Sequence, residues 1–422
     1  LYWRPNADDF QVSYIGKIGT GETVYQGTNR YGIENFLMTQ HKLEVKDDNF
    51  RFHTYMTSDW AGDSYDMNFT AININRMWKP DLNWFAEYVG GIVLGQLGGL
   101  TIDQAHALGR SSADTGRFMP GTQEYMDAFE SVVTNPDLTT GAKFQDESKV
   151  YHTDFNYNFG HMWDWAEVQV GGSYREYSLN SSGTIFTDYD GPINYGDFGV
   201  YTQWVKNMAD DRFTVTAAAR YDKAEFSDGA ITPRVALAYT AGKDRNHNIR
   251  LSYQTGYRNP TTQDLFIGLD VGIARLIGSS PDNPARYVRD YAVSAAGQAL
   301  GVPATVTLTG EAAFDNSFSA SSVQAMAATG NPGLLEASGV EYVKAEQMQS
   351  IEFGWRAKLS NTFTIDANIY RNAYQDFIST EAVISPYYGQ VGDNGLSILA
   401  IANGDFETYS AYTNTDAEIE SW

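Results

Sequence analysis

Hydrophobic and polar residues alternate along many stretches of the chain. In residues 211–223 the apolar positions are Phe213, Val215, Ala217, Ala219 and Tyr221, and the residues between them are mostly polar. Because successive residues of a β-strand point to opposite faces, this pattern predicts a strand with one apolar and one polar surface. The same alternation recurs in further windows, at residues 10–18, 65–71, 151–159, 248–257, 350–359 and 363–369.

Two features distinguish these windows from the strands of a soluble sandwich, which also alternate. No charged residue falls on the apolar face of a window, as expected where a charge facing lipid costs about 2–4 kcal/mol. Most windows are about 9–13 residues long, near the length that a tilted strand needs to cross a bilayer. The pattern predicts an all-β, antiparallel transmembrane barrel, with about 14 strands in this chain and a further strand beginning near Glu418.

Short and long connections between the windows also alternate, as in outer-membrane barrels with short periplasmic turns and longer outer loops. The short ones lie at residues 46–49, 79–81, 160–164, 208–211, 242–246 and 360–361. The long ones lie at residues 19–34, 59–64, 95–148, 180–195, 224–230 and 259–345. Loops this long within a compact architecture are usually functional.

The region after residue 81 is partly helical in this interpretation. Residues 82–92 are assigned to a strand, with a helix as the alternative, and the parity of the strand count depends on that choice. Residues 101–109 have an Asp near their start and a Gly at their end, which favours a helix. Residues 121–132 place Tyr125, Phe129 and Val132 on one helical face.

Composition narrows the class of protein further. Hydrophobic residues make up 42% of the 422 residues, which argues against disorder, and no apolar run is long enough for a transmembrane helix. The formal net charge of −23 makes nucleic acid a poor partner, because its phosphates would be repelled. The absence of Cys excludes disulfides, thiolate metal sites and a Cys nucleophile.

The sequence contains no convincing catalytic or metal-binding motif. The six His residues are scattered, although a site built from His152 with loop carboxylates stays open. Residues 16–23 (GKIGTGET) lack the Lys of a phosphate-binding loop, and no G-x-S-x-G motif occurs. Asp188 and Asp190 are interpreted as solvated loop charge, with calcium binding as the alternative. We therefore predict no catalytic residue, no metal site and no cofactor, and the ligand-binding residues stay unknown.

Aromatic residues near the predicted strand ends suit the interfacial girdle of a membrane barrel. Ordinary packing within hairpins is the alternative. The residues concerned are Trp60, Trp163, Trp165, Tyr177 and Tyr257.

Several ordered segments resemble the barrels of TonB-dependent receptors. They are residues 219–223 (ARYDK), 232–240 (TPRVALAYT), 248–266, with the step GYRNP, and 331–378, which begins NPGLL. Where the family often has Lys-Pro-Glu, this chain has Lys344, Ala345 and Glu346. Residues 105–125 are similar to loops of receptors from Bacteroidota. The resemblance is close over about residues 148–378 and rests on the strand pattern alone elsewhere.

The resemblance implies an outer-membrane barrel of about 22 strands that encloses a plug. On this interpretation residues 1–422 are a partial barrel domain without the plug and the terminal strands, and residues 93–147 and 259–345 are extracellular loops. The implied function is active import of a siderophore, glycan or peptide rather than an enzymatic reaction. The implied partners are the TonB–ExbB–ExbD complex, acting through the N-terminal part, a surface lipoprotein cap, and outer-membrane lipid.

Two other classes of function stay open. A passive porin or a structural outer-membrane barrel would have no plug. A barrel enzyme or a soluble β-rich hydrolase would need a convergent catalytic set, which the sequence does not offer.

Overall fold

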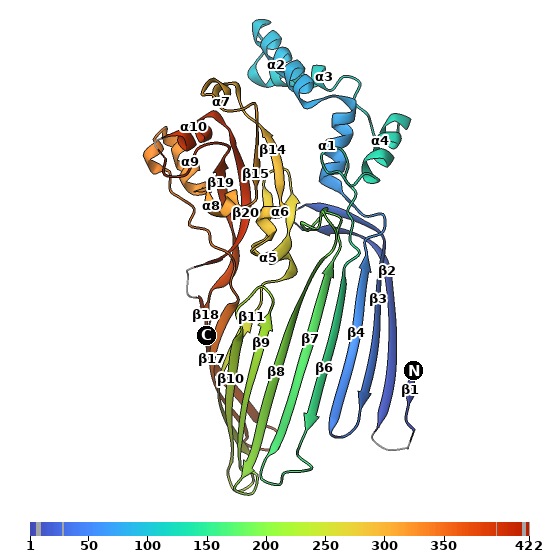
Figure 1. The fold of residues 1–422 in the computed structure, drawn as a ribbon, viewed down its shortest axis with the longest axis vertical. Helices are drawn as coiled ribbons and strands as arrows, with labels where there is room; N and C mark the ends of the chain where they lie inside the picture. Colours follow the sequence, from blue (N-terminus) through green and yellow to red (C-terminus); the bar gives the residue numbers. More distant parts are fainter. Residues whose placement is uncertain (6–9, 28, 394, 416–418, 422) are drawn as a thin grey trace. The chain divides into compact units, whose positions relative to one another are not determined.

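Long antiparallel strands dominate the computed structural model, which describes residues 1–5, 10–27, 29–393, 395–415 and 419–421 (Figure 1). Within these residues the largest sheet has 14 strands, in the order β1-β2-β3-β4-β6-β7-β8-β9-β10-β11-β17-β18-β21, with β5 paired to β3. Its long strands are β2 (Gln11–Gln26), β3 (Arg30–Lys46), β4 (Phe50–Trp60), β6 (Lys149–Asn158), β7 (Glu167–Leu179), β8 (Ile193–Met208), β9 (Phe213–Ala224), β10 (Ala230–Ala241), β11 (His247–Arg258), β17 (Glu346–Lys358) and β18 (Thr364–Gln375). Its short strands are β1 (Tyr2–Trp3), β5 (Tyr65–Asp66) and β21 (Ile419–Ser421). The antiparallel strand architecture that the alternation predicts is confirmed.

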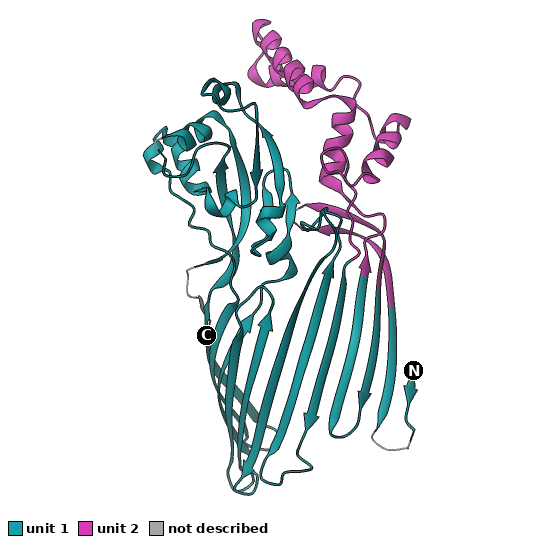
Figure 2. Cartoon of the chain, in the orientation of Figure 1, with its two compact units in different colours: residues 1–17, 39–58, 148–422 teal, residues 18–38, 59–147 magenta. Residues whose placement is uncertain are grey.

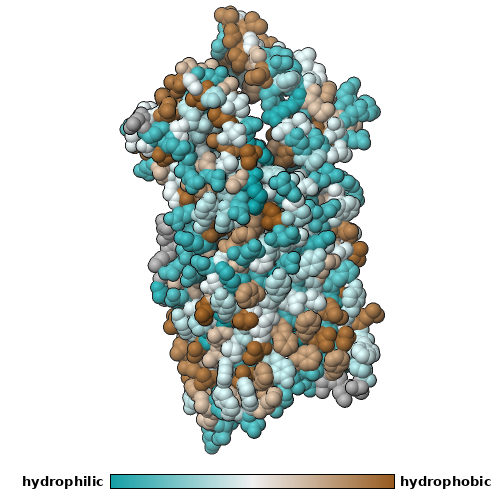
Figure 3. Space-filling model, in the orientation of Figure 1, coloured by the Kyte–Doolittle hydropathy of each residue, from teal (hydrophilic) through white to brown (hydrophobic). Residues whose placement is uncertain are grey.

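Among the described residues, no second layer covers the apolar face of this sheet. Exposed fractions are 44% for Val235, 46% for Leu251, 52% for Ile351 and 46% for Phe353. Figure 3 shows apolar side chains gathered over the lower part of the strands. In water so much exposed apolar area would be unfavourable, whereas a lipid bilayer accepts it at no cost.

The chain divides into two compact units (Figure 2). Unit 1 comprises residues 1–17, 39–58 and 148–422, and unit 2 comprises residues 18–38 and 59–147. Unit 2 contains the helices α1 (Met67–Trp78), α2 (Asp81–Leu97), α3 (Ile102–Ala113) and α4 (Gln123–Val133). Its core joins α1 to α4 through Phe69, Ile74, Ala128, Val132 and Ala142. Among the described residues, no helix is both long and apolar enough to cross a membrane.

The two helices predicted in unit 2 are confirmed. The one expected at residues 101–109 is α3, and a capping box between Thr101 and Gln104 fixes its start. The one expected at residues 121–132 is α4, whose side chain Val132 is buried.

Three predictions in the first part of the chain are wrong. The strand expected at residues 65–71 stops at Asp66, whose carboxylate accepts the N–H groups of Asn68 and Phe69 and so caps α1. The strand expected at residues 82–92 is α2, so the helical alternative holds. The connection expected at residues 19–34 is mostly strand, because β2 continues to Gln26 and β3 begins at Arg30.

The physical reasons differ. A period-two pattern over only seven residues does not exclude a helix. In the window at residues 65–71, Asp66 caps the start of α1 and so favours a helix over the predicted strand. The Gly-rich residues 19–21 look like a turn, yet backbone hydrogen bonds pair two strands whatever their side chains are. The predicted strand start at Glu418 lies outside the described residues.

The connection between β11 and β17 covers residues 259–345 and is itself ordered. It contains α5 (Thr262–Phe266), β12 (Gly268–Asp270), β13 (Arg275–Ile277), α6 (Asn283–Arg286), β14 (Val288–Ala292), α7 (Ala295–Ala299), β15 (Thr305–Thr309), α8 (Ala312–Asp315), β16 (Phe318–Ser319), α9 (Ala320–Thr329) and the 3-10 helix η1 (Pro332–Leu334). The segment after β18 contains β19 (Phe377–Pro386), α10 (Leu396–Asn403) and β20 (Phe406–Thr415). Five of these strands form a sheet in the order β12-β13-β20-β19-β16, and β14 pairs with β15 in a separate two-stranded sheet.

The buried side chains of unit 1 lie mainly in these connections. One cluster contains Ile277, Tyr287, Ala313, Val340, Val383, Tyr409 and Ala411. Another contains Leu179, Phe186, Tyr195, Leu265, Phe266, Val343 and Ile378, at the ends of β7 and β8. The connections therefore supply the hydrophobic core, and the long strands supply a wall with two free faces.

Candidate functional site

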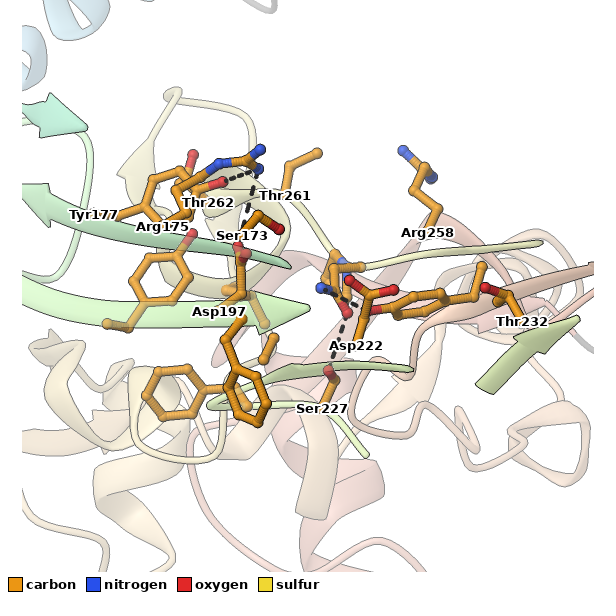
Figure 4. Close-up of a pocket in the computed structure, with 18 of the residues that line it drawn as sticks. Ser173, Arg175, Tyr177, Asp197, Asp222, Ser227, Thr232, Arg258, Thr261 and Thr262 are labelled. Carbon is orange, nitrogen blue, oxygen red and sulfur yellow. Dashed lines mark hydrogen bonds and ion pairs between the residues drawn. The ribbon is translucent and has the colours of Figure 1, made fainter. Parts of the chain in front are cut away.

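A cavity of about 660 Å³ lies on the polar face of the wall, at one end of β7 to β11. On β7 and β9 the lining residues are two apart, as the two-residue period requires. The strand residues that line it include Ser173, Arg175 and Tyr177 of β7, Tyr195 and Asp197 of β8, Arg220 and Asp222 of β9, Thr232 of β10, and Tyr257 and Arg258 of β11. Residues 259–262, which follow β11, complete the lining (Figure 4).

Each Arg of the site is held beside a carboxylate. The Nη1 atom of Arg175 lies 3.9 Å from Asp197 Oδ2, on the directly opposed position of β8. Arg220 Nη2 lies 2.6 Å from Asp222 Oδ1 and also donates to Ser173 Oγ at 2.9 Å. The strand register places unlike charges side by side in the first pair, whereas Arg220 and Asp222 lie two residues apart on the same face of β9.

Arg258 forms a two-pronged pair with Glu346. Its Nε and Nη2 atoms donate to the two carboxylate oxygens of Glu346, at 2.7 and 2.6 Å. Glu346 Oε1 also accepts the N–H of Ile378 at 2.8 Å, so the pair anchors the start of β17. Such two-pronged pairs fix orientation as well as charge.

Charge in the site is therefore balanced. Arg175, Arg220 and Arg258 are matched by Asp197, Asp222 and Glu346. A polyanion would meet no surplus of positive charge here. The site offers fixed donors and acceptors, which suit a ligand with both kinds of polar group.

Aromatic side chains close one side of the cavity. Tyr177 and Tyr195 stack with ring centroids 4.7 Å apart, and Tyr195 also contacts Phe226 and Phe266. The Tyr177 hydroxyl accepts from Arg175 Nη1 at 3.0 Å. The stack links the polar site to the buried cluster that contains Tyr195 and Phe266.

One residue assigned to an interfacial girdle lies elsewhere. Tyr177 lines the polar cavity, so that assignment is wrong for it. Tyr257 lines both this cavity and one that includes apolar-face residues, and its girdle role stays a prediction. Trp163 and Trp165 sit in the turn between β6 and β7, in contact with Trp204, and their girdle role stays a prediction. Trp60 ends β4 and is 46% exposed.

Asp188 is buried, which corrects the view of it as solvated charge. Its carboxylate accepts hydrogen bonds from the N–H groups of Ser181, Ser182 and Gly183 and from the Ser181 hydroxyl. These donors occupy the oxygens that a calcium ion would need. Asp190 is exposed.

His152 lies on β6 and is not part of the cavity. Its ring centroid is 5.0 Å from that of Tyr55 and 5.8 Å from that of His53. Among the described residues, no group of three or more His, Asp or Glu is placed to hold a metal ion.

Sequence reasoning named no ligand-binding residue. The available signal was charge on the polar face near the strand ends, as in Arg220 and Asp222 of the segment ARYDK. Which charges meet depends on the register between neighbouring strands, and a single sequence does not contain it.

The fold defines a class of protein before any comparison is made. Long antiparallel strands, one bare apolar face, one polar face and short turns at one end are the features of an outer-membrane β-barrel wall. The family model described as "TonB dependent receptor-like, beta-barrel" matches residues 2–421. The chain therefore belongs to the TonB-dependent receptors, a family of outer-membrane receptors and transporters rather than enzymes.

Several solved structures are similar to this chain. The siderophore receptor PirA from Pseudomonas aeruginosa matches with a TM-score of 0.50 and 9% identity, over 99% of this chain and 50% of that chain. A variant of the ferric enterobactin receptor PfeA from the same organism, in complex with enterobactin, matches with a TM-score of 0.48 and 12% identity, over 99% and 47%. The FrpB iron transporter from Neisseria meningitidis matches with a TM-score of 0.42 and 9% identity, over 90% and 47%.

The chain spans about half the length of these solved receptors. No curated protein matches it. The similarity of residues 105–125 to Bacteroidota receptors stays a prediction.

Proposed function

We propose that the chain forms part of the wall of an active importer, which carries a ligand across the outer membrane with energy supplied through TonB. The observation that carries this proposal is the charge-balanced cavity on the polar face of β7 to β11. In a barrel the polar face encloses the lumen, so the cavity lies on the path of a ligand. Family membership supports the energy source.

The partners follow from the same assignment. Lipid contacts the apolar face, and the TonB–ExbB–ExbD complex acts through a plug-bearing part of the protein. Residues 93–147 and 259–345 serve as outer loops in this proposal, and a surface lipoprotein is a further partner for them. No described residue has a role in making or breaking a covalent bond.

Two measurements on the gene product that contains this chain test the proposal. Ligand uptake by cells should fall to background when TonB is deleted, because the energised step is lost. In planar bilayers the purified protein should show little steady conductance, since a plug fills the lumen. Large, steady conductance together with TonB-independent uptake would establish a passive porin instead.

A substitution in the cavity tests whether the site takes part in uptake. Arg220→Ala removes the partner of both Asp222 and Ser173, and uptake should fall about tenfold or more because the partly buried Asp222 carboxylate loses its pair. Arg234→Ala, on the same polar face of β10 but outside the cavity, is the matched control and should leave uptake unchanged.

A further inference from the structure

The pairing of β10 with β11 stops before either strand ends. The two strands pair from Ala241 with His247 up to Arg234 with Gln254. Beyond that point β10 continues to Ala230 on its other neighbour β9, and β11 continues to Arg258 on its other neighbour β17. Residues 230–233 and 255–258 thus face each other across an unpaired part of the wall, which we call the window.

A proline stands at the lower edge of the window. Pro233 is the first residue of β10 beyond the last pair, and it has no N–H to donate to a ladder. At the upper edge the Ser227 hydroxyl donates to Asn259 Oδ1 at 3.0 Å. The window is therefore bounded above and below, and at about 3.3 Å per residue its height matches a short stretch of extended chain.

The window joins two cavities. The site on the polar face has a volume of about 660 Å³, and a second cavity of about 750 Å³ includes apolar-face residues such as Ile231, Pro233 and Gln349. Both cavities are lined by Phe226, Ser227, Thr232, Gly256 and Tyr257. A ligand that fills the window would contact both.

A ligand that fills the window must carry hydrogen-bond donors and acceptors. In the window, β10 and β11 do not pair with each other. Their facing edges present backbone N–H and C=O groups, which need hydrogen-bond partners from water or a ligand. The Thr255 hydroxyl oxygen is buried there without a hydrogen-bond partner among the described residues. An acyl chain would leave these groups unsatisfied, whereas an extended peptide backbone supplies donors and acceptors with the required spacing.

We infer that the window binds an oligopeptide in extended form, and that this peptide is the ligand of the import function proposed above, on which the inference rests. The peptide backbone pairs with the edges of β10 and β11. A charged terminus or side chain of the peptide reaches the balanced Arg and Asp groups of the polar cavity, where either sign of charge finds a partner. Side chains that point the other way occupy the second cavity, whose lining is mixed in polarity.

Retention of synthetic peptides by the immobilised protein in detergent tests the inference. The probe is a random-sequence hexapeptide pool with free termini, and mass spectrometry measures the amount retained. A matched pool N-methylated at alternate residues keeps the side chains but loses backbone donors on one side. We expect at least about tenfold weaker retention of that pool, about 1.4 kcal/mol. Equal retention of both pools, or retention of maltohexaose but not of peptide, would overturn the inference.

Gly256 allows the window to be filled without disturbing the wall. A Cβ added there would meet only the flexible end of Met348, at 3.4 Å. Gly256→Phe should place a ring in the window and reduce peptide retention about tenfold or more. The matched control is Gly19→Phe on β2, which lines neither cavity and has nothing within 4 Å of an added Cβ, and it should leave retention nearly unchanged. Hydrogen exchange of β17 reports whether both variants fold, and peptide retention by a folded Gly256→Phe protein that equals the Gly19→Phe value would contradict the inference.

The two proposals fail in different ways. If peptides are not retained but another ligand enters cells in a TonB-dependent manner, the peptide inference is wrong and the import function stands. If peptides are retained and Gly256→Phe abolishes retention, but uptake is independent of TonB, the inference stands and the energised function is wrong.

Discussion

The two longest connections of the molecule fold into different kinds of secondary structure. Residues 61–148 fold into helices, and residues 259–345 add strands to a neighbouring hairpin. In the first, α2 and α3 approach through glycines: a Cβ on Gly91 would lie 2.5 Å from Gly109 Cα. In the second, β13 pairs with β20 in parallel and buries Ile277 and Tyr409 completely.

The difference lies in how much apolar surface each connection covers. On α2, large side chains stay exposed: Leu82 at 84%, Phe85 at 58%, Val89 at 53%, Val93 at 48% and Leu97 at 81%. Brown side chains over α2 are visible in Figure 3. The strand-forming connection buries its apolar side chains beneath its sheet, whereas α2 and α3 of the helical connection meet through close backbone contact and leave apolar side chains exposed.

The largest expected effect is the loss of a large side chain from the strand-forming connection. Ile277→Ala should destabilise it by about 2–5 kcal/mol, because the side chain is fully buried and its removal leaves a cavity. Hydrogen exchange of residues 275–277 and 409–411, measured in detergent, reports the change directly. Ile273→Ala is the matched control, since Ile273 is 86% exposed, and it should shift exchange by less than about 0.5 kcal/mol.

If Ile277→Ala left this exchange unaltered, the connection would not depend on its buried core. The contrast with the helical connection would then disappear.

A smaller effect is expected when bulk is added between α2 and α3. A Cβ on Gly109 would lie 2.5 Å from the carbonyl oxygen of Tyr88, so Gly109→Val should separate the helices at a cost of about 1–3 kcal/mol. Gly90→Ala is the control, and it should change the stability in the opposite direction. Nothing lies within 4 Å of its added Cβ, and alanine should strengthen the helix by up to about 1 kcal/mol.

Hydrogen exchange of the α2 and α3 amides distinguishes the two variants, because it should become faster in Gly109→Val and slower in Gly90→Ala. Faster exchange in both variants would mean that glycine content, rather than close approach, sets the stability of this pair.

The same contrast explains what the sequence could predict. Strands such as β9 and β17 repeat a strong alternation over many residues, and their existence follows from local pattern alone. The limits of the connection at residues 259–345 are also clear, because β11 and β17 bound it on both sides.

What sequence reasoning missed depends on contacts between distant residues. The parallel pairing of Leu276 with Ser410 joins segments far apart in the chain, and no local pattern records it. Arg258 meets Glu346 for the same reason, since the register of β11 against β17 brings them together. Gly91 and Gly95 weaken a helix prediction when considered alone, yet they are the residues that let α3 approach.

The smallest expected effect concerns Asp66, which caps α1 in the helical connection. Burial raises the pKa of its carboxyl group above the ordinary value of 3.8, against the hydrogen bonds from Phe69, Asn29 and Asn68 that lower it. A raised pKa in the folded state means that protonation favours folding. The contribution to stability is complete below pH 3.8 and is lost as pH rises through the higher folded value.

Asp66→Asn should remove this pH dependence, because asparagine caps helices about as well and carries no charge to desolvate. Near neutral pH the variant should match or slightly exceed the stability of the native α1, by less than about 1 kcal/mol. The measurement is exchange of the α1 amides at several pH values, taken as the difference between variant and native protein so that intrinsic rates cancel. A difference that does not change with pH would show that Asp66 is solvated, and that the helical connection is more open than its hydrogen bonds indicate.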